Sequence, residues 1–200
     1  MIWIGDVLVS KGMGGVYNER MLGGARVWDP VRSKLSALYY TGTGVELTSH
    51  MRVLYLGAAN GTTVSHVADY VEVVYAVEFA PRPMQDLLEV SRRRRNIIPV
   101  MADAAHPEQY APLIESVDLL YQDVAQPEQA GIALRNCPFL KTGGILILML
   151  KTRSVDFKRK PTEVFQETID ILTTGGLILQ ESVWLSPYHT DHAALVCVKR

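Results

Sequence analysis

From residue 52 onward, short apolar runs alternate with segments in which apolar residues recur at helical spacing. Runs such as ILILML at residues 145–150 contain no polar residue, which is typical of a parallel strand covered on both faces. Strands are predicted at Val53–Leu56, Val73–Phe79, Ile97–Met101, Asp118–Asp123, Ile145–Lys151, Leu177–Leu185 and Ala193–Val198. Helices are predicted over residues 61–69, 83–94, 107–115, 127–139 and 161–173.

The two ends of the chain depart from this alternation. No helix-length segment separates the last two predicted strands, so they form a hairpin and the final strand runs antiparallel to its neighbours. The glycine-rich opening, up to about Gly24, predicts short strands or a hairpin. After it, Asp29 suits a helix N-cap, Pro30 the first helical position and Gly42 the residue that ends the helix.

The order of these elements predicts an α/β fold built on a doubly wound, mostly parallel seven-stranded sheet with an antiparallel C-terminal strand. We place this Rossmann-like domain at residues 28–200, after a short N-terminal β region at residues 1–27. The chain has 200 residues, which suits one α/β core of this size. A sheet of this kind ending in a hairpin is the architecture expected of a class I methyltransferase that uses S-adenosylmethionine.

Composition limits which binding partners and which cellular compartment we expect for the protein. The formal net charge is −1, from 20 basic and 21 acidic residues, so any nucleic acid has to be held by a local basic patch or through partner proteins. No apolar run is long enough to span a bilayer, and the first residues do not resemble a signal peptide. Cys137 and Cys197 lack paired spacing. We therefore expect a reduced, cytoplasmic compartment, no membrane association and no zinc site.

The first strand of the domain leads into a turn, Gly57–Gly61, that lacks the glycine pair of a dinucleotide site. Thr62 and Thr63 open the next helix, where amide groups can receive a carboxylate. Glu78 ends the second strand at the spacing expected for binding ribose hydroxyls, and Asp103 follows the third strand, near an adenine edge. Such a site suits S-adenosylmethionine, which has no phosphate. The alternative is that both acids are solvated strand ends.

Several motifs resemble the fibrillarin family, in the order in which that family has them. They are WDPVRSKLSA, VLYLGAANGTTVSHV, VYAVEF, RNIIPVMADAAHP, DVAQPEQ, GGILILMLKTRSVD and DHAALV, and the likeness spans about residues 27 to 198. The chain lacks the glycine–arginine-rich extension of eukaryotic members, so it is similar to the archaeal ones. The resemblance implies methyl transfer from S-adenosylmethionine to ribose 2′-hydroxyls of ribosomal and transfer RNA. It also implies a box C/D guide RNA, a Nop-family scaffold and a kink-turn-binding ribosomal-type protein as partners.

The resemblance also implies roles for individual residues. It assigns cofactor binding, beside Gly57 of the turn, to Thr62, Thr63, Glu78, Phe79, Asp103, Ala104, Asp123, Val124, Ala125 and Gln126. It assigns the chemistry to Lys34, Asp123, Lys151 and His192. The sequence departs from the family at residues 58–60 of the turn, which read AAN, and at Gln122, where alanine is common in the family. None of these departures touches the four chemical residues.

The chemistry gives reasons for those four residue types. A ribose 2′-hydroxyl must lose its proton as it attacks a methyl group, and a lysine accepts that proton only where burial or another cation favours its neutral form. Lys151 follows an apolar run, while Lys34 can add positive charge or orient the ribose. Asp123 can position both lysines, and the antiparallel last strand brings His192 to the same edge. Each residue also has an ordinary explanation as a half-buried or surface polar side chain.

Two basic runs are candidate RNA contacts. SRRRRN at residues 91–96 either contacts phosphates or simply favours the dipole of a helix end. Arg153, Lys158, Arg159 and Lys160 form a second patch just after Lys151. His189 and His192 have a spacing that can suit a metal, but no third ligand is apparent.

Two other functions remain open at this point. One is a methyltransferase acting on a small molecule or a protein side chain. The other is a non-catalytic ribonucleoprotein subunit that binds the cofactor only structurally. A nicotinamide oxidoreductase is a more distant alternative, which the turn at Gly57–Gly61 disfavours.

Overall fold

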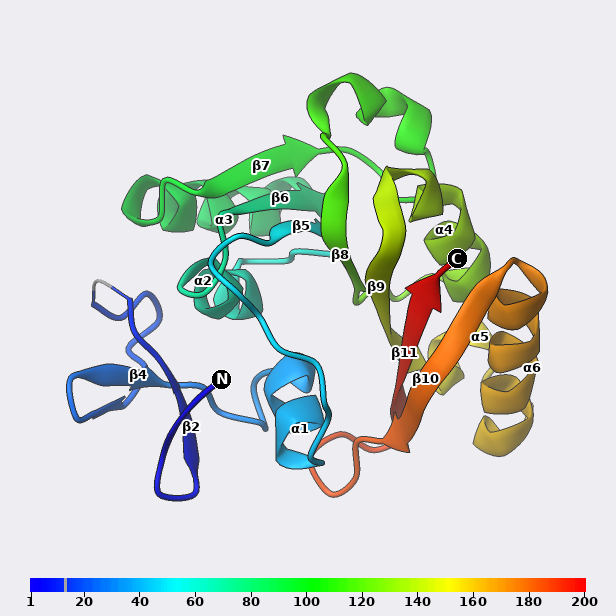
Figure 1. Cartoon of the computed structure of the whole chain (residues 1–200), viewed down its shortest axis with the longest axis horizontal. Coiled ribbons are helices and arrows are strands. Elements are labelled where there is room, and N and C mark those ends of the chain that lie inside the picture. Colours follow the sequence, from blue (N-terminus) through cyan, green and yellow to red (C-terminus); the bar gives the residue numbers. More distant parts are fainter. Residues whose placement is uncertain (13) are drawn as a thin grey trace.

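The computed structural model describes residues 1–12 and 14–200. It contains a seven-stranded sheet, ordered β10-β11-β9-β8-β5-β6-β7, and a small four-stranded sheet, ordered β1-β2-β4-β3 (Figure 1). The strands are β1 Ile2–Ile4, β2 Val7–Ser10, β3 Met21–Leu22, β4 Ala25–Val27, β5 Arg52–Leu56, β6 Val73–Glu78, β7 Ile97–Met101, β8 Val117–Gln122, β9 Leu140–Lys151, β10 Leu177–Trp184 and β11 His192–Lys199. The α-helices are α1 Lys34–Tyr40, α2 Thr62–Ala68, α3 Pro81–Arg93, α4 Gln129–Asn136, α5 Thr152–Val155 and α6 Pro161–Thr174.

The large sheet is parallel from β9 through β7. Strand β11 lies between β9 and β10 and is antiparallel to both, as the sequence predicts. Alternate residues of β5 face opposite sides of the sheet, so Val53 and Tyr55 join one hydrophobic cluster while Leu54 and Leu56 join another. Helices α1, α2 and α3 pack on the first face, and α4 and α6 on the second. The parallel strands therefore share one carboxyl-end edge.

The helix expected from Asp29 to Gly42 begins later than predicted. The Asp29 carboxylate accepts a hydrogen bond from the Val31 amide (2.8 Å), which closes a turn in place of a helical start. Ser33 is the actual N-cap, and its hydroxyl accepts from the Ser36 amide. The helix then ends before Gly42, as expected, and Gly42 has a φ of +86°. The consequence is that Lys34 becomes the first helical residue.

The helix predicted over residues 107–115 is also absent. Two single 3₁₀ turns replace it, η1 Pro107–Gln109 and η2 Ala111–Leu113. Pro112 has no amide hydrogen to donate to a helical ladder, so the pattern cannot continue as one α-helix. The segment predicted at 127–139 likewise divides into α4 and a 3₁₀ turn, η3 Cys137–Phe139.

The N-terminal β region packs on α2 through a sealed group of charges. Arg26 is paired with Glu19 and with Asp69 (2.8 Å to Asp69), and Arg94 also contacts Asp69 (2.8 Å). All four side chains are at most 5% exposed. Burial is the largest single influence on Glu19 and opposes its ionisation, but the Arg26 hydrogen bond, two backbone hydrogen bonds and the Arg26 charge together outweigh it and lower the pKa of Glu19 to about 2. We call these four residues the buried ion cluster.

His66 sits beside this cluster and is stacked on Trp28, with 5.1 Å between ring centroids. The Ser10 hydroxyl has one hydrogen and donates it to Asp69, so it accepts its other bond, 2.8 Å long, from Nδ1 of His66. Burial, reinforced by Arg26, lowers the pKa of His66 to about 3. The ring is therefore neutral at ordinary pH.

In the part of the chain that the structure describes, none of the helices is both long and apolar enough to cross a membrane. Within those same residues, no three His, Cys, Asp or Glu side chains are grouped so that they can hold a metal ion.

Candidate active site

A cavity of about 280 Å³ opens at the carboxyl ends of the parallel strands. The segments that follow β5, β6, β7 and β8 supply its walls, and Lys151 at the end of β9 completes them. Nine residues expected at a cofactor site line it: Gly57, Glu78, Phe79, Asp103, Ala104, Asp123, Val124, Ala125 and Gln126. Segments far apart in sequence thus meet where the topology of an open α/β sheet places its ligands.

The turn after β5 has the backbone shape that its glycines allow. Gly57 has a φ of +79°, and a Cβ there would lie 2.6 Å from the Asp123 carbonyl oxygen. Gly61 has a φ of +83° and caps α2 without a side-chain hydrogen bond. The missing side chain at Gly57 therefore lets the turn approach the segment that carries Asp123.

Glu78 ends β6 and is 7% exposed. One of its carboxylate oxygens accepts from the Ala59 amide and the other from the Ala80 amide, each at 2.8 Å. These two bonds fix the carboxylate against the turn. Each oxygen still has a second lone pair with which it can accept from a ligand hydroxyl.

Asp103 lines the same cavity as Glu78, and hydrogen bonds fix its carboxylate in place. Its Oδ1 accepts from the Ala105 amide (2.9 Å) and from the Gln126 side-chain amide (3.1 Å). The backbone hydrogen bond from Ala105 is the main reason that the pKa of Asp103 lies below its usual range. Phe79 is 61% exposed at the edge of the same cavity, where its ring is available to a ligand.

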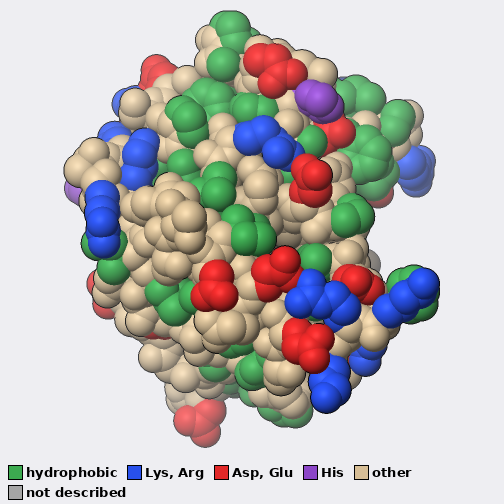
Figure 2. All heavy atoms as spheres, turned by 90° about the vertical axis from the view of Figure 1, so that its right-hand side faces the viewer, with side chains coloured by type: hydrophobic (Ala, Val, Ile, Leu, Met, Phe, Trp, Pro, Cys, Tyr) green, Lys and Arg blue, Asp and Glu red, His purple; other side chains and the backbone are tan. Residues whose placement is uncertain are grey.

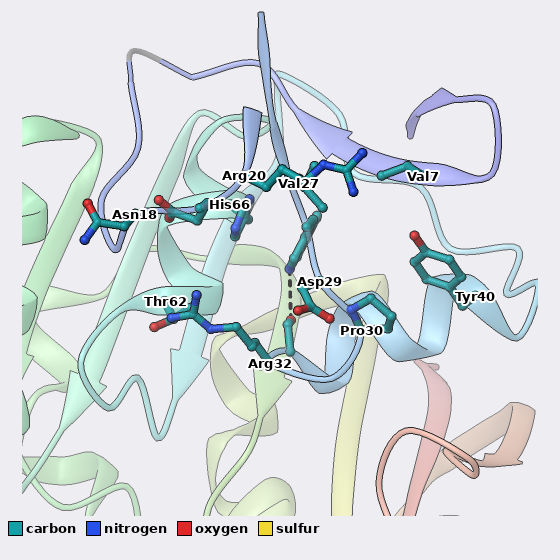
Figure 3. Close-up of a pocket in the computed structure, with 13 residues that line it drawn as sticks. Val7, Asn18, Arg20, Val27, Asp29, Pro30, Arg32, Tyr40, Thr62 and His66 are labelled. Atoms are coloured by element: carbon teal, nitrogen blue, oxygen red, sulfur yellow. Dashed lines mark hydrogen bonds between the residues drawn. The ribbon is translucent and has the colours of Figure 1, made fainter. Parts of the chain in front are cut away.

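Thr62 and Thr63 are not among the residues that line this cavity, and the expectation that they bind the cofactor at the start of α2 stays a prediction. The Thr62 hydroxyl donates to the Asn60 side chain (3.1 Å), and the Thr63 hydroxyl to Ser33 (3.0 Å). Thr62 instead lines a second cavity of about 320 Å³, between the N-terminal β region and helices α1 and α2. Figure 3 shows Arg32 extending toward Thr62 in that cavity. Both hydroxyls thus have partners within the chain.

Three of the four expected chemical residues form one ionic group. Asp123 follows β8, and its Oδ2 accepts from Nζ of Lys34 (2.9 Å) while its Oδ1 lies 3.1 Å from Nζ of Lys151. Lys34 stands in the first turn of α1, where the helix dipole disfavours a cation, so the ion pair with Asp123 offsets that cost. The three side chains are 16%, 17% and 21% exposed for Lys34, Asp123 and Lys151. One carboxylate thus serves two ammonium groups that solvent reaches.

His192 joins this group from β11, where it is paired with Lys151 across the sheet. Its Nδ1 lies 2.6 Å from the Thr190 carbonyl, which can only accept, so Nδ1 carries the hydrogen and Nε2 keeps a free lone pair. Burial lowers the pKa of His192, the two lysines lower it further, and the Thr190 bond and Asp123 oppose them. The ring is therefore neutral at neutral pH.

Gln129 is a supporting residue that the sequence did not indicate. It is 1% exposed at the start of α4, and its side-chain amide bonds both the carbonyl (3.1 Å) and the amide (3.0 Å) of Lys151. Gln122 in turn donates to the Gln129 carbonyl (2.7 Å). This chain of hydrogen bonds fixes the end of β9. The motif DVAQPEQ locates Gln129 in the sequence, but no pattern reveals that it holds a strand 22 residues away.

The charges of the cavity determine what it can hold. Glu78, Asp103 and Asp123 line it, and Lys151 is the one cation among the lining residues that the structure describes. A pyrophosphate would face carboxylates, whereas a cationic ligand with hydroxyl groups finds acceptors on two walls. The site therefore favours a sulfonium compound bearing a ribose over a dinucleotide.

Comparisons with known proteins agree with this geometry. The family model for fibrillarin matches residues 9–200. A fibrillarin-like rRNA/tRNA 2′-O-methyltransferase from Methanoculleus marisnigri is 67% identical over 207 residues, covering 100% of each protein. In a fibrillarin/Nop5p complex, one chain has a TM-score of 0.93 and 42% identity, covering 97% of this chain and 94% of that one. Aeropyrum pernix fibrillarin with natively bound S-adenosyl-L-methionine has a TM-score of 0.87 and 43% identity, covering 96% and 89%. These likenesses confirm the predicted class I methyltransferase fold.

Proposed function

Because this chain belongs to the fibrillarin family, we propose that it methylates ribose 2′-hydroxyls of ribosomal and transfer RNA with S-adenosylmethionine. The observation that carries the proposal is the pairing of Lys34 and Lys151 on Asp123, at the mouth of the acid-lined cavity. A cavity alone supports many methyltransferases. Two ammonium groups beside a cofactor cavity suit an acceptor that becomes an oxyanion and is flanked by phosphates.

The residues around the cavity fit the cofactor. S-adenosylmethionine supplies an electrophilic methyl group on a sulfonium cation. Glu78 would accept from its ribose hydroxyls, while Asp103 and Gln126 would meet the adenine edge beside Phe79. The turn that begins at Gly57 would receive the methionine part of the cofactor. Because Gly57 has no side chain, the backbone of this turn can lie close to the backbone of Asp123.

The four chemical residues would divide the work on the acceptor. Lys34 and Lys151 would hold the ribose oxygen in line with the methyl group and stabilise its developing negative charge. Asp123 would fix the distance between the two ammonium groups. The proton of the hydroxyl would leave to a lysine in its neutral form or to Nε2 of His192, which has a free lone pair because the hydrogen of the neutral ring is on Nδ1, bonded to the Thr190 carbonyl. Alignment and proton removal would thus both come from this one group of side chains.

We also infer that the enzyme acts in a guide particle. The fibrillarin/Nop5p complex supports a Nop-family scaffold as a direct partner. A box C/D guide RNA and a kink-turn-binding protein complete the proposal, because a chain of net charge −1 needs help to hold and select RNA. The cytoplasmic location expected from the sequence stays a prediction, as does the division at residues 27 and 28.

The test is methyl transfer from labelled S-adenosylmethionine in a particle reconstituted with guide RNA and a target strand. We expect label in the guided nucleotide, and none when that nucleotide is 2′-deoxy. Label in the deoxy target would overturn ribose 2′-O transfer. Turnover of a small molecule or protein by the isolated chain would favour the second enzymatic function, and unchanged transfer by Lys151→Ala would favour a structural subunit.

A further inference from the structure

The end of β9 extends beyond β8, the strand that flanks it on one side. The pairing of β8 with β9 runs to Gln122, which lies opposite Leu148, whereas β9 continues to Lys151. On the other side, β11 accompanies β9 to its last residue, where His192 is paired with Lys151. The backbone of Lys151 thus stands beside β11 but past the end of β8, at the place where the crevice opens.

The side chain of Gln129 occupies the place beside Lys151 that a longer β8 would take. The Thr152 amide donates toward β11, to the Asp191 carbonyl, so the backbone groups of Lys151 point the other way. There the Gln129 Oε1 accepts from the Lys151 amide (3.0 Å) and the Gln129 Nε2 donates to the Lys151 carbonyl (3.1 Å). A side-chain amide carries a donor and an acceptor as a peptide group does. Gln129 therefore holds this backbone as a neighbouring strand would.

Gln129 is itself held in place. It is the first residue of α4 and is 1% exposed. The side chain of Gln122, which is fully buried, donates to the Gln129 carbonyl at 2.7 Å. Gln122 ends β8 and immediately precedes Asp123, the carboxylate that pairs with Lys151. We call Gln122 and Gln129 the glutamine clamp, because together they tie the ends of β8 and β9 to the start of α4.

The glutamine clamp supports both sides of the reaction. Nζ of Lys151 lies 3.1 Å from Oδ1 of Asp123, and the lysine side chain starts from the backbone that Gln129 holds. A lysine has a flexible four-carbon stem, so a shift of its backbone moves the ammonium group. Residues 124–126, which lie between the two glutamines in sequence, line the cofactor cavity. The wall of that cavity and the position of Lys151 therefore share one support.

Gln129 acts from the interior of the molecule. Figure 2, which looks onto the side that carries β10 and α6, shows acidic and basic side chains interspersed over that surface, where water screens them. Gln129 is almost fully buried by contrast, so water competes little for its hydrogen bonds. It is also not among the described residues that line the cofactor cavity. Any effect of Gln129 on the reaction therefore passes through the residues that it holds.

We infer that Gln129 is a positioning residue of the methyl transfer, which holds Lys151 so that its ammonium group, the acceptor oxygen and the methyl group stay aligned. This rests on the proposed function. The attack on the methyl group is in line, and a displacement of about 1 Å can lower such a rate about 10²-fold. Loss of the two bonds to Lys151 therefore lowers kcat much more than it raises the KM for the acceptor strand or weakens the affinity for S-adenosylmethionine.

The test is a double-mutant cycle in the reconstituted guide particle. Gln129→Met keeps the approximate size of the side chain and removes both bonds, and it should lower kcat about 10- to 100-fold. In a Lys151→Ala background the same change should alter kcat by less than about twofold, because the residue that Gln129 positions is gone. Single turnover with labelled S-adenosylmethionine measures the residual transfer. A loss by the same factor with and without Lys151 would overturn the inference.

Asn96→Ala is the matched control. The Asn96 side-chain amide also holds backbone, since it donates to the Ala68 carbonyl (2.8 Å) and to the Val71 carbonyl (3.1 Å). It precedes β7, however, at the edge of the sheet opposite to the crevice. Asn96→Ala should lower the free energy of unfolding in urea and leave kcat within about twofold of wild type. An equal loss of kcat in this control would show that lost stability alone slows transfer, and the inference would fail.

Hydrogen exchange at the Lys151 amide gives a readout that does not depend on activity. Gln129→Met removes the acceptor of that amide, so its exchange should become about tenfold faster. The Leu148 amide, within the paired part of β9, should keep its protection. Unchanged exchange at Lys151 would mean that Gln129 does not hold this backbone, which contradicts the inference.

Gln122→Ala tests the other half of the glutamine clamp and serves if Gln129→Met does not fold. It removes the bond to the Gln129 carbonyl, so kcat should fall several-fold, again only where Lys151 is present. The absence of any loss of kcat in the folded clamp variants would overturn the inference. A wild-type particle that does not label the guided ribose, or unchanged transfer by Lys151→Ala, would contradict the proposed function. Normal wild-type labelling with unaffected clamp variants contradicts this inference alone.

Discussion

The molecule contains two groups of paired charges that differ in balance and in access to solvent. In the buried ion cluster, Arg26 and Arg94 face Glu19 and Asp69, and each side chain is at most 5% exposed. At the crevice, Asp123 faces both Lys34 and Lys151, and the three are 16% to 21% exposed. The first group is neutral and closed. The second has one positive charge in excess and is open.

The difference indicates what each group does. Charges removed from water carry a large desolvation cost, which opposite charges at close range offset, and in the buried ion cluster each arginine is paired with a carboxylate. The buried ion cluster joins the N-terminal β region to the domain. The crevice group leaves positive charge unmatched where solvent and ligands reach it, so it can stabilise negative charge that arrives or develops there. Changes to the two groups should therefore affect different measurements.

The largest effect is expected at the crevice. Lys151→Ala should lower methyl transfer by about 10² to 10⁴, the range that a positioned proton-transfer or charged group contributes. The free energy of unfolding should change little, because the pair is partly solvated. Lys141→Ala is the control: Lys141 lies near the start of the same strand, at the end opposite to Lys151, and contacts Asp118 at 2.6 Å. An equal loss of methyl transfer in both variants would mean that the position of Lys151 in the crevice does not account for its effect.

Next in size is a change in the buried ion cluster. Asp69→Asn leaves Arg26 and Arg94 buried with an incomplete set of partners, which should lower the free energy of unfolding by about 3–5 kcal/mol. Transfer per folded molecule should be retained. Urea unfolding measures the first quantity, and single-turnover transfer at low temperature the second. Asp86→Asn, in an exposed pair with Arg82, should cost less than about 1 kcal/mol.

A smaller effect is expected at two glycines, Gly57 and Gly42. Comparing them separates the cost of backbone strain from the effect of a side chain that touches Asp123. Gly57→Ala and Gly42→Ala both place a side chain at positive φ, which costs about 1–2 kcal/mol of stability at Gly42 and more at Gly57, where the Cβ also meets backbone. Only at Gly57 does the new Cβ meet Asp123, 2.6 Å from its carbonyl oxygen, while Gly42 has open space. Transfer should fall in Gly57→Ala alone. Equal activity of the two variants would mean that the turn does not set the position of Asp123.

The last effect concerns pH, and it is small near neutral pH. The pKa of His66 is lowered to about 3 in the folded chain from an ordinary value of 6.5. Below pH 6.5 the unfolded chain therefore binds a proton that the folded chain does not. His66 stabilises the fold fully above that pH, and this contribution is lost as the pH falls toward 3. The slope should approach about 1.4 kcal/mol per pH unit.

His66→Gln should flatten this slope between about pH 6.5 and 5, above the range where the acidic side chains titrate. His50→Gln, at an exposed histidine, should leave it intact. Unfolding free energies measured across this range decide the matter, and identical slopes in the wild type and His66→Gln would contradict the assignment.

Much of the fold was predictable because apolar runs and the spacing of apolar residues are local properties of the sequence. All seven strands of the large sheet lie where the runs predict them, and the antiparallel final strand follows from the missing helix before it. The errors fall at prolines. Pro30 is equally compatible with the first position of a helix and with a turn, and the structure has a turn there. Pro112 interrupts a segment whose apolar spacing alone is helical. Which alternative wins depends on side-chain hydrogen bonds that the pattern does not contain.

The site was predictable where topology fixes it and not where orientation does. Glu78, Asp103, Asp123 and Lys151 each stand at a strand end, and parallel strands bring such ends together. Side-chain direction is a different matter. The Thr63 hydroxyl donates to the Ser33 side chain, a contact between α2 and the residue before α1 that no local pattern in the sequence specifies.

Long-range polar contacts were the other part that sequence did not reveal. The buried ion cluster joins Arg26 to Asp69 across 43 residues, and its members look like ordinary loop and helix polar residues in the sequence. Their burial depends on how the N-terminal β region docks on α2, which no local pattern specifies.

The place of β11 in the sheet has a consequence for synthesis of the protein. Strand β11 lies between β9 and β10, both of which precede it in the chain. A ribosome therefore delivers the two flanking strands first, and they cannot pair with each other without closing the slot that β11 must enter. His192 opens that strand, so the crevice is assembled only when the inserted strand is in place. A nascent chain that has passed β10 can carry the cavity and both lysines, yet it gains the complete group of four only as its sheet closes.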